Sequence, residues 1–357
     1  MSQLKREPEK YDLLSLFGAM SKKLGLRINS EKSINKFLET ITESIHEIQN
    51  NKRLIYGKRI ESLFPIMLLA LGETKLIKQE DTGDVISNGD KIRVPDYRVV
   101  TNNGESFYVE VKNHHMRDFN DPYILRGRYI KELKSYCNIG KLPLKFAIYY
   151  SSVNQWVLLD IDSFDEVNGN YIIDFADALS RNEMGLLGDK SIGMKPNLEL
   201  ILLANTDATS TVSESGECEF VIGDVKFKCA GVDLTSDLDK QIAFFCILYG
   251  KWIEGRAEAI IEDKILKAVV FSYEPEHEKG QGFEIIGSLS SLISNKYKAL
   301  TTDGDEITAT EINISPNDIC FSLPENYRSE ELPLWIFTFM PNPKTYKLPR
   351  AFIQNSD

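Results

Sequence analysis

The sequence predicts a mixed α/β fold: a mixed sheet flanked by helices, with a helical N-terminal extension and a C-terminal α+β domain. Two observations carry this prediction. The period of the apolar residues changes from helical to alternating after residue 71, and residues 54–161 follow the order helix, strand, strand, helix, strand, strand. With 357 residues, 42% hydrophobic and 27% charged, the chain suits a globular protein with two cores.

Helices are predicted throughout the first 71 residues. A long apolar stripe at helical spacing follows Ser30 or Ser33, either of which can cap the helix; its members are Ile34, Phe37, Leu38, Ile41, Ile45 and Ile48. Residues 54–71 form a further apolar helix that Gly72 can end. We therefore expect a helical extension over residues 1–53 and a main domain over residues 54–185.

The sheet of this main domain is predicted from alternation. Residues 91–100 and 107–113 alternate around Asn103-Gly104, a strong hairpin turn signal. A helix is expected at 122–137, with Leu125, Tyr129, Leu133 and Tyr136 as its inner stripe, and strands at 145–151 and 155–161.

The second half of the chain differs from the first in composition and in the order of its predicted elements. Residues 185–197 are rich in Gly, Lys and Asn and are typical of a linker. An acidic α+β domain of unknown role is expected over 198–357. Its predicted elements are a strand at 198–204, hairpins at 218–230 and 257–273, helices at 236–249 and 288–297, and strands near 306–314 and 334–340.

Charge divides the chain unequally. Residues 1–185 hold 26 basic and 26 acidic residues, whereas residues 186–357 hold 16 and 27, so the second half carries the whole net charge of −11. Within the neutral half, residues 112–145 form a local basic patch. A polyanion should therefore meet the first half more readily than the second.

Other features of the composition bear on location. Five cysteines without a CxxC pair argue against a disulfide framework and fit a reducing cytoplasm. The charged N-terminal segment lacks an apolar signal core, and no run of about eighteen apolar residues occurs. The expectation is a cytoplasmic protein without a membrane partner.

Four polar residues stand out in the predicted helix and hairpin. Asp96 follows Pro95 on one strand; Glu110 and Lys112 lie two apart on the next, so they share a face; Glu61 lies on the preceding helix. Carboxylates on neighbouring strands can converge on one magnesium ion, which takes oxygen ligands. Lys112 on the same face can orient a water molecule or stabilise developing negative charge.

This pattern resembles the PD-(D/E)xK nuclease superfamily, which has the restriction-endonuclease-like fold. The matching residues are Pro95-Asp96 and Glu110-Val111-Lys112, with Glu61 as the helical acid, and the resemblance covers about residues 54–162. It implies an Mg²⁺-dependent endonuclease, in which Mn²⁺ may substitute, with Asp96, Glu110, Lys112 and Glu61 as catalytic residues. The implied metal ligands are Asp96, Glu110, Glu61 and the carbonyl of Val111.

Nucleic acid is the expected partner, and the resemblance favours DNA over RNA. The basic residues of the predicted helix could contact phosphates beside the metal, and His114 could contact substrate; the helix residues are Arg126, Arg128, Lys131 and Lys134. Lys131 and Glu132 are both in range to be further active-site residues. Restriction or other defence against foreign DNA is a compatible role, and a homodimer is left open.

Alternatives from other classes remain. The fold could be a catalytically inactive module that binds nucleic acid or a protein partner, or Glu110 and Lys112 could be a salt bridge on an edge strand. An interaction protein built around the acidic C-terminal domain is a third hypothesis. No phosphate-binding P-loop, GxGxxG or GxSxG motif is present.

Overall fold

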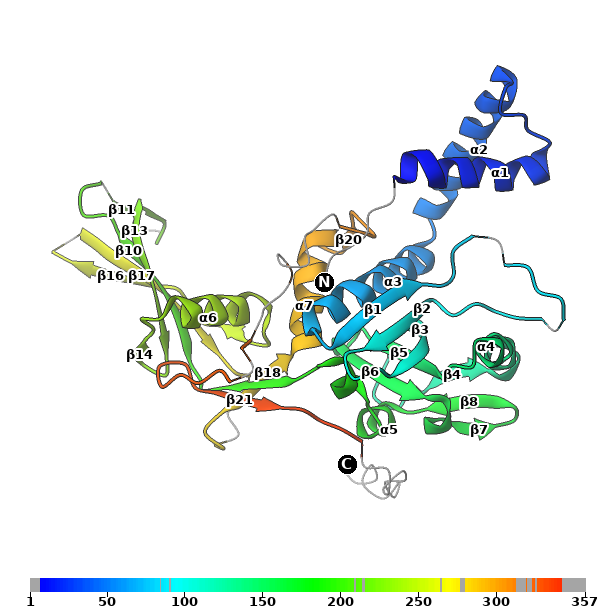
Figure 1. The fold of residues 1–357 in the computed structure, drawn as a ribbon. Helices are drawn as coiled ribbons and strands as arrows, with labels where there is room; N and C mark the ends of the chain where they lie inside the picture. The colour runs from blue at the N-terminus through cyan, green and yellow to red at the C-terminus, as the bar shows by residue number, and fades with distance from the viewer. Residues whose placement is uncertain are drawn as a thin grey trace. The chain divides into compact units, whose positions relative to one another are not determined.

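The computed structural model describes residues 7–83, 85–89, 91–208, 210–213, 216–263, 265–276, 280–312, 319, 323–324 and 326–341. The chain divides into two compact units (Figure 1). The first comprises residues 1–183, 299–318 and 341–357, and the second comprises 184–298 and 319–340. Both units are discontinuous along the sequence, since residues 299–318 of the first lie between the two segments of the second, whereas the predicted domains are continuous.

The first unit begins with helices and continues with strands and one long crossover helix. Its helices are η1 (Pro8–Asp12), α1 (Leu13–Leu24), α2 (Glu31–Gln49), α3 (Lys52–Leu71), α4 (Gly127–Gly140), η2 (Ile161–Ser163) and α5 (Phe175–Ser180). Its strands are β1 (Thr74–Gln79), β2 (Tyr97–Thr101), β3 (Ser106–His114), β4 (Tyr123–Arg126), β5 (Leu144–Tyr150), β6 (Gln155–Asp160), β7 (Asp165–Val167), β8 (Asn170–Ile173), β19 (Thr302–Asp303) and β20 (Glu306–Ile307).

The main sheet has the order β1-β2-β3-β5-β6. All neighbours are antiparallel except β3 and β5, which run parallel and are joined by the segment that contains α4. Phe64 of α3 packs against Tyr97 and Trp156 on one face of the sheet. Tyr136 of α4 packs edge-on against Tyr108 on the other face. The predicted mixed sheet flanked by helices is confirmed.

The region before α4 differs from the prediction. Residues 123–126 form a strand, β4, in a second sheet of order β4-β8-β7, and the helix begins only at Gly127. A Cβ added at Gly127 would lie 1.9 Å from the backbone oxygen of Gly169, so only glycine permits this close approach of the chain. Residues 91–96 are not strand, and the sequence reasoning missed β1.

The second unit is mainly strands with two long helices. Its helices are η3 (Met184–Leu187), α6 (Asp237–Tyr249) and α7 (Leu289–Thr301), the last three residues of which belong to the first unit. Its strands are β9 (Ser191–Met194), β10 (Leu198–Ala204), β11 (Thr211–Val212), β12 (Cys218–Glu219), β13 (Ile222–Cys229), β14 (Val232–Asp233), β15 (Ile253–Glu254), β16 (Glu258–Glu262), β17 (Ile265–Glu274), β18 (Glu284–Ser288) and β21 (Leu334–Phe337).

Two predictions for this unit are wrong. Residues 185–197 are not a linker, because β9 is the central strand of the sheet β18-β9-β21 and buries Ile192 and Met194. Gly223 is not a hairpin turn, because β13 continues past it beside β10, with a register shift that leaves Gly223 without a partner in the ladder. A Cβ at Gly223 would lie 3.0 Å from Asn205, so the glycine serves close packing instead.

Of the strand predicted near 306–314, β20 covers 306–307, and residues 313–314 lie outside the described part.

Two further findings concern the described residues as a whole. None of their helices combines the length and apolar character needed to cross a membrane. The four cysteines among them, Cys137, Cys218, Cys229 and Cys246, are free thiols, and three of these are buried.

Candidate active site

Asp96 lies directly before β2, where the ladder between β2 and β3 stops at the Tyr97–Val109 pair. The backbone N–H of Val111, two residues further along β3, therefore finds no backbone partner in β2. The Asp96 carboxylate takes that place, and its Oδ2 accepts the Val111 N–H at 2.6 Å. Because the N–H and C=O of a strand residue point to the same side, the Val111 carbonyl also faces the Asp96 side of β3.

The Glu110 carboxylate is the most enclosed acid of this region, with 3% of the residue exposed. Its Oε1 accepts hydrogen bonds from the Lys112 ammonium and from the Tyr129 hydroxyl. Its Oε2 is buried and has no hydrogen-bond partner. A buried carboxylate oxygen without a partner is costly, so this atom needs an explanation.

The charges of these groups perturb one another. Burial, and then the negative charge of Glu110, raise the pKa of Asp96 to about 7. Burial lowers the pKa of Lys112, but the charges of Glu110 and Asp96 outweigh it, so its pKa is raised. The site thus places two carboxylates beside one ammonium group. When both carboxylates are ionised, the three groups together carry one negative charge that no neighbour among them balances.

This donor set suits a hard divalent cation. Magnesium commonly uses one or two protein carboxylates and keeps several waters. Asp96, the free Oε2 of Glu110 and the Val111 carbonyl are oxygen donors of that kind. In the described part of the chain, however, no three or more His, Cys, Asp and Glu side chains gather into a group that could hold a metal. The three predicted carboxylates therefore do not form one direct cluster.

Glu61 is the carboxylate that stands apart. Its Oε1 forms an ion pair with Lys58 of the same helix at 2.7 Å. Its backbone carbonyl accepts a hydrogen bond from the Tyr97 hydroxyl at 3.1 Å, which ties α3 to β2. After burial and Glu110, the charge of Glu61 also contributes to the raised pKa of Asp96, so it acts on the site electrostatically.

Tyr129 of α4 is a site residue that the sequence reasoning assigned only to the inner apolar stripe. Burial, and then the charge of Glu110, raise its pKa, so it stays a neutral hydrogen-bond donor. The Arg93 guanidinium lies 4.7 Å from the centre of its ring and 3.5 Å from Glu132. A hydroxylated side chain facing the Glu110 strand is the signal that could have identified it.

Lys131 and Glu132, the two further candidates on this helix, differ in exposure and in partners. Lys131 is exposed, whereas Glu132 accepts ion pairs from Arg128 at 3.1 Å and from Arg93 at 3.5 Å. Glu132 therefore holds the Arg93 guanidinium next to the Tyr129 ring.

The predicted phosphate-contacting residues are spread over two elements. Arg126 is exposed on β4 rather than on the helix, and Arg128 is exposed on α4 with 77% of its side chain accessible. Lys134 is half-buried, with its ammonium 5.5 Å from the centre of the Tyr171 ring. Arg126, Arg128 and Lys131 are thus the exposed members of the set, and Lys134 is only partly accessible.

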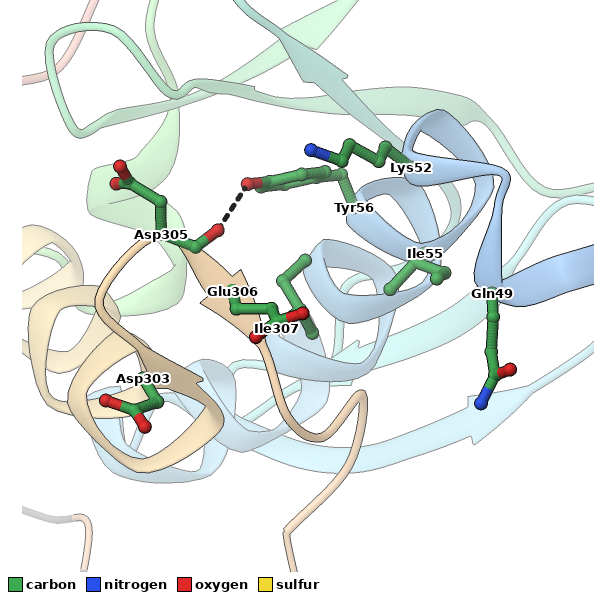
Figure 2. Close-up of a pocket in the computed structure, with 8 residues that line it drawn as sticks. All are labelled: Gln49, Lys52, Ile55, Tyr56, Asp303, Asp305, Glu306 and Ile307. Carbon is green, nitrogen blue, oxygen red and sulfur yellow. Dashed lines mark hydrogen bonds between the residues drawn. The ribbon is translucent and has the colours of Figure 1, made fainter. Parts of the chain in front are cut away.

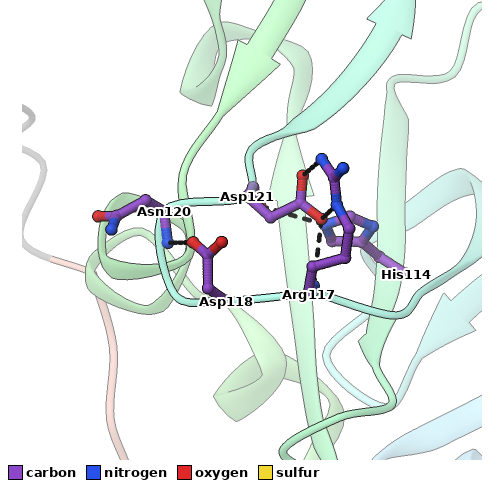
Figure 3. A network of polar contacts seen from close by, with 5 residues as sticks. All are labelled: His114, Arg117, Asp118, Asn120 and Asp121. Atoms are coloured by element: carbon purple, nitrogen blue, oxygen red, sulfur yellow. Dashed lines mark hydrogen bonds and ion pairs between the residues drawn. The ribbon is translucent and has the colours of Figure 1, made fainter.

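His114 ends β3 and begins a loop with its own polar network (Figure 3). Its Nε2 lies 3.3 Å from the Asp121 carbonyl, and its ring packs against Tyr123 and Tyr150. Arg117 binds the Asp121 carboxylate through two side-chain nitrogens and its backbone N–H. These contacts support a structural role for His114 in holding the loop.

A cavity of about 680 Å³ lies elsewhere in the first unit (Figure 2). Residues of α3 and of the β19–β20 hairpin line it together with Gln49 of α2, and the Tyr56 hydroxyl donates to the Asp305 carbonyl at 3.3 Å. Asp96, Glu110 and Lys112 are not among the lining residues. The carboxylate and lysine cluster, not this cavity, is the candidate active site.

Comparisons with known proteins give one partial likeness. No family model matches the chain, and no curated protein matches it in sequence. Among solved structures, it is similar to a Holliday junction resolvase from Archaeoglobus fulgidus, an archaeal hyperthermophile. The similarity has 16% identity and a TM-score of 0.22, and covers 26% of this chain and 78% of the resolvase. Likeness at this level assigns neither family nor activity.

Proposed function

We propose that the protein is a metal-dependent nuclease of the PD-(D/E)xK kind and that its active site consists of Asp96, Glu110 and Lys112. One observation carries the proposal: the buried Oε2 of Glu110 lacks a partner beside a second carboxylate and a lysine. A protein that kept these groups only for stability would leave an avoidable cost in its core.

Each residue then has a defined task. Asp96, Glu110 and the Val111 carbonyl would hold the cation, which offsets phosphate charge and lowers the pKa of water. Lys112 keeps its positive charge because of its carboxylate neighbours, so it can orient a water molecule or stabilise negative charge on phosphate. Tyr129 fixes the Glu110 carboxylate, and Glu61 acts on Asp96 through its charge.

DNA is the substrate we propose, bound by the exposed basic residues near the site. Arg126, Arg128 and Lys131 would contact backbone phosphates, which provide affinity without base specificity. The second half of the chain carries the net negative charge and should contribute little to non-specific binding.

The test is cleavage by the purified full-length chain. Supercoiled plasmid, linear duplex, branched DNA and RNA are incubated with Mg²⁺, with Mn²⁺ or with EDTA. We expect metal-dependent cleavage that is lost in Asp96→Asn and Glu110→Gln. Glu105→Gln is the matched control, because Glu105 lies in the turn of the same hairpin and is exposed.

The outcomes separate the proposal from its alternative. Loss of cleavage in the two site variants, with Glu105→Gln active, supports the assignment. Nucleic-acid binding without cleavage under any metal condition identifies an inactive binding module. Full cleavage by Asp96→Asn places the active site elsewhere.

A further inference from the structure

The N-terminal helices α1 and α2 form an element with almost no buried surface. None of the residues of α1 is buried, and Phe37 is the buried residue of α2. The two helices contact each other through Phe17 and Phe37, whose ring centres are 5.0 Å apart. With Phe37 as the one buried residue of the two helices, most of their leucine and isoleucine side chains remain accessible to solvent.

The apolar residues that remain on α2 follow a coiled-coil register. Ile34, Leu38, Ile41, Ile45 and Ile48 recur at alternating spacings of four and three, and we call this set the seam. Leu38, Ile45 and Ile48 are 54%, 50% and 43% exposed. Such a stripe is the pattern of a helix that packs through one face, and the exposure of Leu38, Ile45 and Ile48 shows that the described part of this chain leaves that face partly uncovered.

The exposed area is sufficient for a stable interface. Seven leucine and isoleucine side chains of the two helices are between 41% and 55% exposed: Leu13, Leu14, Leu16 and Leu24 on α1, and Leu38, Ile45 and Ile48 of the seam on α2. At about 80 Å² each, these side chains could bury roughly 600 Å² per copy. A standard interface buries about 800 Å² per partner, of which a little over half is apolar.

The charge of α2 decides between occupants. Its polar positions hold Glu31, Glu39, Glu43 and Glu47 against Lys32 and Lys36. An amphipathic helix that lies on an anionic membrane is rich in lysine and arginine on its polar face, so this helix is poorly suited to one. The charges at positions 32, 36, 39, 43 and 47 lie on the side of α2 away from the seam, so they do not oppose its packing against a second copy of the same helix.

We infer that α1 and α2 are a dimerisation element, in which the seam packs against the seam of a second copy of this chain. The two pairs of helices then make a four-helix bundle related by a two-fold axis, so that the same surface is used on both sides. The inference stands independently of the proposed nuclease activity.

The test measures the mass of the full-length chain by light scattering during size-exclusion chromatography, at several concentrations. We expect about twice 40.6 kDa for the wild type. The seam variant Leu38→Glu with Ile45→Glu places charges in the apolar interface and should raise the dimer dissociation constant at least about 100-fold. Its helical circular dichroism should persist, because glutamate is as good a helix former as isoleucine or better.

Lys36→Glu is the matched control. It changes the net charge by the same two units but lies away from the seam, where Lys36 pairs with Glu39 at 3.8 Å. We expect this variant to remain dimeric. A wild type that is monomeric at 100 µM overturns the inference, as does a seam variant that dimerises as tightly as the wild type.

A second measurement tests the register directly. In a Cys218→Ser background, which removes the thiol that is exposed in the described part of the chain, Ile41→Cys should form an intermolecular disulfide under mild oxidation. Glu43→Cys, on the opposite side of α2, should not. Equal cross-linking of both variants, or cross-linking of Glu43→Cys alone, contradicts the seam as the contact surface.

Discussion

The Tyr129 hydroxyl donates a hydrogen bond to Oε1 of Glu110, across the space between α4 and β3. The same oxygen accepts a second hydrogen bond from the Lys112 ammonium, so Oε1 has two donors while Oε2 has no hydrogen-bond partner. Two donors on one oxygen fix the plane of the carboxylate and leave its other oxygen available. This orientation is what a metal ligand requires, because partners around a ligand determine its direction.

Replacing Tyr129 with Phe should therefore weaken the site without unfolding the protein. We expect metal affinity or cleavage rate to fall by about 10–100-fold, the usual cost of losing a group that orients a ligand. The measurement is cleavage rate against metal concentration, since a positioning role shifts the metal dependence.

Tyr136→Phe is the control for that variant. Tyr136 also lies on α4, and its hydroxyl also donates to a glutamate, Glu80, at 2.9 Å. Glu80 is not part of the proposed site, so activity should be unchanged. An equal loss of activity in both variants would show that α4 stability, not Glu110, is affected.

Asp96 gives a prediction for pH. Burial and Glu110 raise its pKa to about 7, whereas an unfolded aspartate ionises near 3.8. A cation must displace the proton from Asp96, so metal affinity should rise about tenfold per pH unit up to pH 7 and level off above it. Calorimetric titration with Mg²⁺ or Mn²⁺ between pH 5.5 and 8.5 measures this; in Asp96→Asn the rise should disappear.

The raised pKa of Asp96 also predicts how the stability of the fold changes with pH. The native state holds the proton of Asp96 more tightly than the unfolded state, so the stabilising contribution is present below pH 3.8. It is lost progressively as the pH rises through about 7. In the absence of metal, the melting temperature of Asp96→Asn relative to the wild type should increase across this range. A constant difference would contradict the raised pKa.

The sequence predicted the polar cluster better than its surroundings. Asp96, Glu110 and Lys112 could be predicted to meet because alternation along β3 and an Asn-Gly turn fix which side chains share a face. Tyr129 could not be assigned a partner, because an inner-stripe tyrosine on an amphipathic helix is compatible with simple packing. Its contact with Glu110 depends on how α4 lies across the sheet.

The local sequence pattern predicts the wrong element where a strand depends on partners far away in the sequence. Residues 123–126 continue an apolar pattern into α4, but β8, more than forty residues away, pairs with them as a strand. Similarly, β9 has the glycine-rich composition of a linker and becomes a central strand through β18 and β21. Nothing within either segment reveals these partners.

Two glycines in helices should respond to alanine in opposite ways. A Cβ at Gly127 would meet the backbone oxygen of Gly169 at 1.9 Å, whereas a Cβ at Gly57 in α3 has nothing within 4 Å. Gly127→Ala should destabilise the protein by about 1–3 kcal/mol or more, because backbone must shift. Gly57→Ala should stabilise it by about 0.5–1 kcal/mol through helix propensity. Urea unfolding measures both; a shift of the same sign in both would contradict the close approach.

The exposed basic residues predict a salt dependence of binding. Arg126 and Lys131 are solvent-accessible, and each phosphate contact releases counterions when DNA binds. In an Asp96→Asn background, which prevents cleavage, the double variant Arg126→Ala with Lys131→Ala should flatten the slope of log affinity against log salt by about two. Lys32→Ala with Lys36→Ala removes the same charge from α2 and should leave the slope unchanged. Fluorescence anisotropy of a labelled duplex over a salt series distinguishes the two.

Equal flattening of the slope in both double variants would mean that overall charge, and not a basic face beside the site, attracts DNA. An unchanged slope in the variant Arg126→Ala with Lys131→Ala would place the phosphate contacts on other residues.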